Sequence, residues 1–198
     1  MKPSAPVRVL HVVNSLGLGG TEKTMQLLVR HLDRSIFSPL VHSAQDGPRR
    51  AQLKACGVPV AVGGDLFALT ERFRPHVVHV HRAGWAEPAV LTPILRHKPR
   101  VLVETNVFGR HDDSPGGAAF HLRLFVSRFC LERYARDFGP RADLSRCRVL
   151  PNPVDTDLFE RLCPAPDLSR PVAGRLTRPD PGKWSHLVFA MLPELARL

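Results

Sequence analysis

The sequence lacks a hydrophobic run long enough to cross a bilayer, which takes roughly 20 apolar residues in a helix. It also lacks a recognisable secretory signal, because Lys2 alone precedes a short apolar run that Arg8 and His11 interrupt. Both absences argue against a membrane-spanning or secreted protein. We expect a soluble protein located in the cytoplasm.

Cysteine is sparse, and its four positions show no short paired spacing: Cys56, Cys130, Cys147 and Cys163. This spacing argues against a cysteine-based zinc site and against a disulfide scaffold. We expect these residues to be reduced and structural.

Acidic residues are also in deficit, with 18 of them against 28 Lys and Arg, for a formal net charge of +10. A basic surface attracts nucleotide diphosphates, anionic membranes or nucleic acid. An arginine-rich composition with no specific partner is equally compatible, so charge alone does not identify a ligand.

Short Val- and Leu-rich runs alternate with helical patterns over most of the chain. Strands are expected at 7–13, 39–43, 58–62, 76–81, 101–105 and 148–150. Helices are expected from Thr21 onward and at 49–56, 68–73, 86–96 and 117–137. This alternation predicts an α/β fold class: a Rossmann-like parallel sheet with helices on both faces.

Proline and polar residues then interrupt the pattern, with Pro164 and Pro166 breaking any long element. We expect a first domain over residues 1–160, a linker over 161–170 and the start of a second domain over 171–198. About thirty residues do not bury a core of their own, so the second domain is expected to be truncated.

Glycines cluster directly after the first predicted strand, at Gly17, Gly19 and Gly20. Glycine lets the backbone turn sharply and approach a ligand, and the following helix directs unpaired N–H groups at an anion. A dinucleotide fingerprint fails, because Glu22 stands where the third glycine is needed. An NAD site also lacks an acidic residue at the end of the second predicted strand, where Ser43 stands. The turn either faces a different ligand or is purely structural.

Two histidines, His79 and His81, lie two residues apart and therefore on one face of a predicted strand. That spacing suits a metal, but no third ligand is evident, so the sequence predicts no metal site. We expect His79 to be a hydrogen-bonded histidine of the sheet. His81 ends the predicted strand at the mouth where ligands bind, so we expect it to make a polar contact there.

Two further segments have competing interpretations. Residues 111–117 resemble a cation loop but lack an EF-hand register, so we interpret them as a mobile surface loop. The predicted helix over 117–137 fits either a basic helix on an anionic membrane or a core helix with a solvated arginine face. Its arginines are Arg123, Arg128, Arg133 and Arg136.

Two cations, Arg178 and Lys183, stand five residues apart across a Pro-Asp-Pro-Gly bend. They are able to converge on one diphosphate and to offset charge that builds up on a leaving group. A basic solvated loop is the alternative.

Four segments, taken together, resemble the retaining glycosyltransferases of family 4, which have the two-domain GT-B fold. They are residues 9–13 with 17–22, 76–81, 150–159, and 174–176 leading to Lys183. The resemblance covers almost the whole chain and implies the N-terminal half of a GT-B glycosyltransferase, which shapes the acceptor side. It further implies that Arg178 and Lys183 contact the donor diphosphate and that Gly19 and Gly20 face the donor phosphates and sugar.

The sequence departs from the family pattern at three places. Asn106 lies in the segment 104–107, where many members place a histidine near the donor sugar, and it is expected to take a polar contact. Asn152 precedes Pro153 in place of the usual glycine. The Glu-x7-Glu motif of the second domain has no counterpart before Leu198, so the polypeptide as given is not expected to catalyse transfer by itself.

The resemblance leads to the hypothesis of a metal-independent transfer of a sugar from a nucleotide-sugar donor to an acceptor hydroxyl, with retention. Gly17, His81, Asn106 and Asn152 are the expected cleft-lining residues, and no catalytic residue is assigned. We expect a lipid-linked or anionic acceptor, peripheral contact with an anionic membrane at its inner face, no cofactor and no nucleic-acid partner. The alternatives are a non-catalytic truncated nucleotide-binding or interaction module and an NAD-dependent enzyme.

Overall fold

The computed structural model describes residues 5–162, 169, 186–195 and 197. The chain divides into two compact units, Met1–Asp155 and Thr156–Leu198. Within the described ranges, every helix is too short or too polar to cross a membrane. Arg178 and Lys183 lie outside the described residues.

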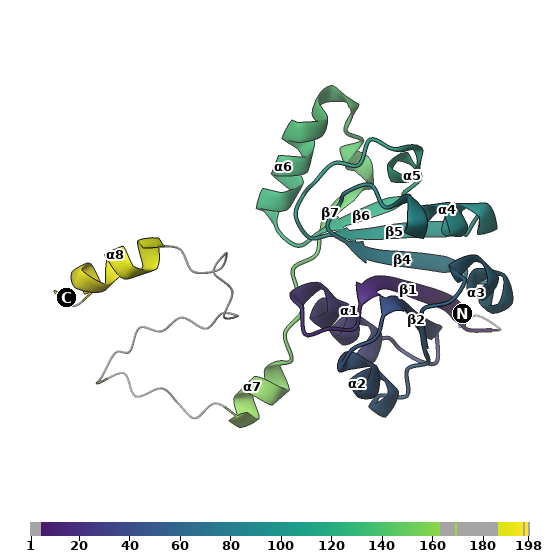
Figure 1. Ribbon diagram of the computed structural model, residues 1–198, viewed down its shortest axis with the longest axis horizontal. Helices are drawn as coiled ribbons and strands as arrows, with labels where there is room; N and C mark the ends of the chain where they lie inside the picture. The colour runs from purple at the N-terminus through teal and green to yellow at the C-terminus, as the bar shows by residue number, and fades with distance from the viewer. Residues whose placement is uncertain (1–4, 163–168, 170–185, 196, 198) are drawn as a thin grey trace. The chain divides into compact units, whose positions relative to one another are not determined.

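The first unit is built on a seven-stranded parallel sheet in the order β3-β2-β1-β4-β5-β6-β7 (Figure 1). The strands are β1 (Val7–Ser15), β2 (Phe37–Gln45), β3 (Val60–Val62), β4 (Val77–Arg82), β5 (Val101–Asn106), β6 (Leu122–Phe125) and β7 (Cys147–Val149). Each predicted strand is present, shifted by at most two residues at either end. The chain leaves β1 toward one edge and then crosses back to β4, so the carboxyl ends of β1 and β4 form a topological switch point.

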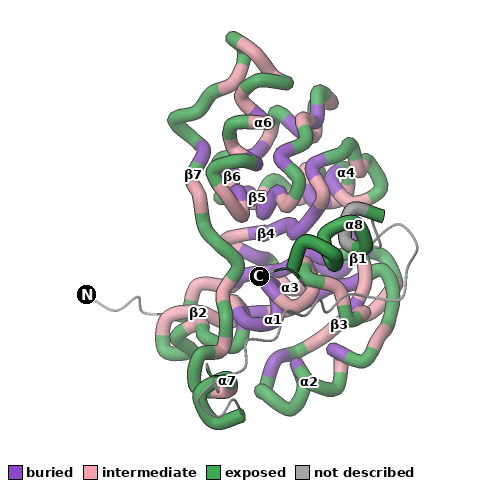
Figure 2. Tube along the Cα trace, turned by 90° about the vertical axis from the view of Figure 1, so that its left-hand side faces the viewer, coloured by how far each residue is buried: buried purple, intermediate pink, exposed green. Residues whose placement is uncertain are grey.

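Helices cover both faces of this sheet because successive strand residues point to opposite sides. They are α1 (Gly20–Arg30), α2 (Arg49–Ala55), α3 (Leu66–Phe73), α4 (Pro88–His97), α5 (Pro115–Ala118) and α6 (Arg128–Phe138). On one face, Leu69 of α3 and Ile94 of α4 pack in the same cluster as Leu10 of β1. On the other face, Met25 of α1 packs with Val13. Figure 2 shows buried residues on the central strands between these layers.

The prediction of one long helix over 117–137 is wrong. The segment instead contains the end of α5, the strand β6 and most of α6. The burial of β6 alternates along the strand, which is the period of a strand and not of a helix. Ser127 then starts α6, because its side-chain oxygen accepts a hydrogen bond from the Cys130 N–H at 3.2 Å.

The correction changes the interpretation of the predicted arginine face. Arg123 lies on β6 and is buried, so it does not belong to a basic helix surface. Tyr134 and Cys130 of α6 pack on Phe125, as expected of a helix that covers a core. Phe129 remains exposed on the same helix.

The second unit contains the helices α7 (Thr156–Leu162) and α8 (His186–Leu195) in its described part. The helix α8 lies in the segment 171–198, which the sequence assigns to the start of a second domain. The domain boundaries at 160 and 170 remain predictions, because most of residues 161–185 lies outside the described part of the chain.

Candidate functional site

A pocket of about 200 Å³ opens at the carboxyl ends of β1 and β4, the switch point of the sheet. Its walls come from the ends of β1 and β4, from the start of α1 and from the loops after β4 and β5. The lining residues are Val13, Asn14, Thr21, Glu22, His81, Arg82, Ala83, Trp85, Glu87, Val107 and Phe108. Of the predicted site residues, His81 lines this pocket.

Contacts within the chain explain why glycine is needed in the turn before α1. Gly19 is the N-cap of α1 and has no side-chain cap. A Cβ atom on Gly19 would lie 2.2 Å from Oε2 of Glu22, whose other oxygen accepts a hydrogen bond from the Ser15 hydroxyl at 2.7 Å. Glu22 thus brings a carboxylate to the positive end of the helix. Gly17 donates its N–H to the same hydroxyl, Oγ of Ser15, at 3.3 Å, and Gly20 is exposed as the first residue of α1.

Two aromatic rings, Trp85 and Phe108, stand at the mouth of the pocket. They are 54% and 51% exposed, and their ring centroids lie 5.9 Å apart at an interplanar angle of 47°. Beside them, burial raises the pKa of Glu87, although the nearby Arg82 opposes this shift. The mouth therefore combines apolar ring faces with carboxylate acceptors.

A buried network of two guanidinium groups and two carboxylates lies behind the pocket. Glu104 of β5 accepts a hydrogen bond from Arg82 Nε at 2.8 Å and pairs with Arg123 Nε at 3.3 Å. Arg82 also reaches Asp112 at 2.7 Å and donates to the carbonyl oxygen of Trp85. Burial raises the pKa of Glu104, against the two arginines that lower it.

This network revises the interpretation of residues 111–117 as a mobile surface loop. Asp112 is only 8% exposed and is tied to the strand β4 through Arg82. Ser114 caps the short helix α5 by accepting a hydrogen bond from the Gly117 N–H at 3.2 Å. The loop is therefore anchored at both of these points.

Asn106 uses its amide to hold the loop that carries Phe108. Its Oδ1 accepts a hydrogen bond from the Gly109 N–H, and its Nδ2 donates to the Arg110 carbonyl oxygen, both at 2.8 Å. Its side chain is 1% exposed. A contact from Asn106 to a ligand remains a prediction.

His79 and His81 are joined by a third histidine that no local pattern connects to them. His11 of β1 lies directly opposite His79 in the register of β1 and β4. His79 is a hydrogen-bonded histidine of the sheet, as predicted, because its Nε2 lies 2.8 Å from Oγ1 of Thr105. Burial lowers the pKa of His79 to about 4 and the pKa values of His11 and His81 well below the usual value.

Asn152 contacts α1, a helix that is distant from it in the sequence. Its Oδ1 accepts a hydrogen bond from the Thr24 hydroxyl at 3.0 Å, and Asp155 pairs with Arg30 at 2.9 Å. These two contacts hold the segment after β7 along the helix that begins at the glycine turn. The structure thus brings Asn152 and the glycine turn to one helix.

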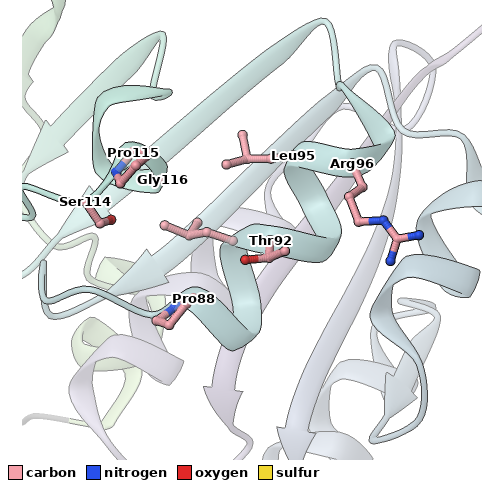
Figure 3. Close-up of a pocket in the computed structure, with 8 residues that line it drawn as sticks. Pro88, Thr92, Leu95, Arg96, Ser114, Pro115 and Gly116 are labelled. Atoms are coloured by element: carbon pink, nitrogen blue, oxygen red, sulfur yellow. The ribbon is translucent and has the colours of Figure 1, made fainter.

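Two other hollows are weaker candidates. A hollow of about 500 Å³ lies on the other side of the β1 carboxyl end, between the ends of β2 and β3 and the starts of α3 and α4. Another, of about 410 Å³, runs between α4 and α5 (Figure 3). Ser114 there caps α5, and the Arg96 guanidinium stacks on Phe67, so two of its polar side chains are already engaged.

The strand β2 extends further than predicted, which bears on the dinucleotide alternative. It ends at Gln45, and the next residue is Asp46, so an acidic side chain does follow this strand. The Asp46 carboxylate is held by Arg50 at 2.7 Å and by the Gly47 N–H at 2.8 Å. The glycine count still fails at Glu22.

Sequence reasoning missed Trp85, Phe108, Glu87 and His11. The two aromatic residues follow the ends of β4 and β5 within a few positions, and that placement is a signal for a ligand-binding edge. The role of His11 had no such signal, because its neighbours come from a strand that lies far away in the sequence.

In sequence, the chain is similar to a mannosyltransferase. It is 32% identical over 130 residues to the GDP-mannose-dependent alpha-(1-6)-phosphatidylinositol monomannoside mannosyltransferase of Mycolicibacterium smegmatis. The match spans 60% of this chain and 28% of that protein. No protein-family model matches the chain.

In structure, the chain is similar to Anabaena Alr3699/HepE. The match to its complex with UDP and glucose has a TM-score of 0.59 at 15% identity and covers 77% of this chain and 46% of that one. The match to its complex with UDP-glucose has a TM-score of 0.59 at 16% identity and covers 77% and 45%. These matches and the seven-stranded sheet confirm the Rossmann-like α/β fold. The chain spans less than half the length of each of these proteins.

Proposed function

We propose that this chain forms the acceptor-side, N-terminal half of a GT-B glycosyltransferase of family 4. The complete enzyme transfers a hexose from a nucleotide-sugar donor to an acceptor hydroxyl with retention. The observation that carries the proposal is the pocket at the switch point, with its ring faces and carboxylates. The likeness to a mannosyltransferase supports the choice of reaction.

The donor side of the proposal uses the start of α1 and two residues outside the described part of the chain. The family resemblance brings the donor phosphates to Gly19 and Gly20, at the positive end of the eleven-residue helix α1, where they would displace the Glu22 carboxylate. The family resemblance adds Arg178 and Lys183 as contacts to the donor diphosphate. The donor is the substrate, and the proposal includes no further cofactor.

The acceptor side uses the mouth of the pocket. Exposed rings such as Trp85 and Phe108 pack against the apolar face of a polyhydroxylated ring, and Glu87 accepts hydrogen bonds from its hydroxyls. The net charge of +10 favours a lipid-linked or anionic acceptor and contact with an anionic membrane at its cytoplasmic face. His81 lines this pocket. Gly17, Asn106 and Asn152 are cleft residues only by the family resemblance, and the buried amide of Asn106 holds the loop that carries Phe108.

Ligand-observed NMR on the purified chain tests the acceptor side. The probes are methyl α-mannoside and myo-inositol 1-phosphate as ring acceptors, and GDP-mannose and UDP-glucose as donors. Trp85→Ala removes one ring face, so we expect ring-acceptor binding to weaken about three- to tenfold. Phe129→Ala is the matched control, because Phe129 is also a largely exposed aromatic residue, at 66% against 54% for Trp85, and lies outside the pocket lining. Equal effects of the two substitutions contradict the proposed acceptor site.

The transfer reaction is tested by sequencing the gene beyond the codon for Leu198 and assaying the protein that it encodes. A continuing frame with two glutamates eight residues apart, whose product transfers labelled sugar, supports the enzyme. NMR of the product then reports whether the anomeric configuration is retained. A genuine stop codon refutes the enzyme and leaves a non-catalytic binding module. Tight NAD binding by the chain also contradicts the proposal.

A further inference from the structure

Three imidazole rings meet across the two central strands of the sheet. His11 of β1 is the register partner of His79 on β4, and His81 follows on the same face of β4. One ring nitrogen from each residue lies within 4.8 Å of the other two. The same face carries Val13 and Val41 in an apolar core, so the three polar rings interrupt a surface that otherwise needs no polar atoms.

Some ring nitrogens of this histidine cluster have no hydrogen-bond partner among the described residues. Nδ1 of His11 and Nε2 of His81 lie 3.1 Å apart. The other two nitrogens of these rings, Nε2 of His11 and Nδ1 of His81, are buried and have no hydrogen-bond partner within the described part of the chain. His11 and His81 are only 3% and 2% exposed. Buried polar atoms in folded proteins are almost always paired, so hydrogen bonds among these residues alone do not account for the cluster.

We propose that His11, His79 and His81 bind one divalent transition-metal ion, with Zn²⁺ as the best fit. Imidazole nitrogen is a preferred ligand of Zn²⁺, and tetrahedral coordination places the nitrogens about 3.3 Å apart. Nδ1 of His11 and Nε2 of His81 already have nearly this spacing, so an ion bound between them would replace their mutual contact, and the other nitrogen of each ring would need a separate partner. The ligand nitrogen of His79 lies within 4.8 Å of the other two, so metal binding requires the rings to approach by up to about 1.5 Å.

The surroundings of the cluster match those of a metal site in two respects. Thr105 holds the ring of His79 through a 2.8 Å contact to Nε2, as an outer hydrogen-bond partner holds a metal-binding histidine. His81 also lines the 200 Å³ pocket, so a fourth coordination position has access from that side. Water or a ligand oxygen there completes a tetrahedron. The ion would join β1 to β4 beside the proposed acceptor pocket, which His81 also lines, and the metal titration tests it without any measurement of sugar transfer.

Metal titration of the untagged, chelator-treated chain tests this site. Co²⁺ is the spectroscopic probe, because its visible absorption reports tetrahedral coordination, and Zn²⁺ is then added as a competitor. We expect one equivalent of Co²⁺ to bind, Zn²⁺ to displace it, and bound Zn²⁺ to raise the melting temperature. His79→Gln and His81→Gln are each expected to weaken the affinity at least tenfold.

The control is His42→Gln. His42 is also buried, has an unpartnered Nδ1 among the described residues, and lies on β2 opposite Val12, on the other face of the sheet. Its substitution should leave the affinity unchanged. X-ray absorption on the zinc-loaded, unmutated chain gives an independent count of imidazole ligands, should a variant fail to fold. Absence of one-equivalent binding, fewer than three imidazole ligands, or equal affinity in the cluster variants overturns the proposal.

Discussion

Replacing Glu104 by Gln should destabilise the protein strongly without changing the size of its side chain. Glu104 is 1% exposed and faces two buried guanidinium groups, those of Arg82 at 2.8 Å and Arg123 at 3.3 Å. With Asp112, the network contains two positive and two negative groups. The substitution removes one negative charge and leaves one buried guanidinium uncompensated.

The expected cost follows from this burial. Removing one partner of a buried ion pair costs about 3–5 kcal/mol, because the other charge remains desolvated and unpaired. Burial raises the pKa of Glu104 and so favours its neutral form, which places the expected cost at the lower end of this range. A domain of this size has a free energy of unfolding of about 5–15 kcal/mol in total. The Glu104→Gln variant should therefore lose about a fifth or more of its stability.

Urea unfolding followed by circular dichroism measures the loss, with an unchanged dependence on urea showing that the folded state is preserved. Asp46→Asn is the control, since Asp46 pairs with Arg50 at 2.7 Å on the exposed surface. The control should change little, because solvent screens such pairs. A loss below about 1 kcal/mol for Glu104→Gln would refute the view that the substitution leaves a buried guanidinium without a compensating charge.

Two further predictions concern the backbone and the pH dependence. Gly109→Ala should destabilise the chain by more than Gly57→Ala, because both glycines have positive φ angles but a Cβ atom on Gly109 would lie 2.1 Å from the Cys130 carbonyl oxygen. Urea midpoints check this. Burial lowers the pKa of His42, so the unfolded chain takes up a proton first, and stability is lost as the pH falls below about 6.5. His42→Gln should flatten that loss by at most about 1.4 kcal/mol per pH unit in metal-free protein.

Equal urea midpoints for the two glycine variants would show that the Gly109 loop moves away from Cys130 at no cost. Identical pH slopes for His42→Gln and the unmutated chain would show that His42 is protonated equally in the folded and unfolded states.

The local pattern of the sequence was sufficient to predict the fold class and most of the strands. Val- and Leu-rich runs are typical of strands buried on both faces, and that signal lies within each segment. It failed at β6, where Arg123 looked like a solvated residue of a helix. The partner that buries it, Glu104, lies on a neighbouring strand, and a local pattern contains no information about that pairing.

The candidate site depended more strongly on the tertiary structure. The sequence by itself determined the glycine turn and the spacing of His79 and His81, and it predicted at which edge of the sheet a ligand would bind. Only the fold decided that β4 lies beside β1, which brings His11 opposite His79 and gathers Trp85 and Phe108 at one mouth. The physical reason is that strand order and register arise from packing between distant segments, whereas periodicity and turn chemistry arise within each segment.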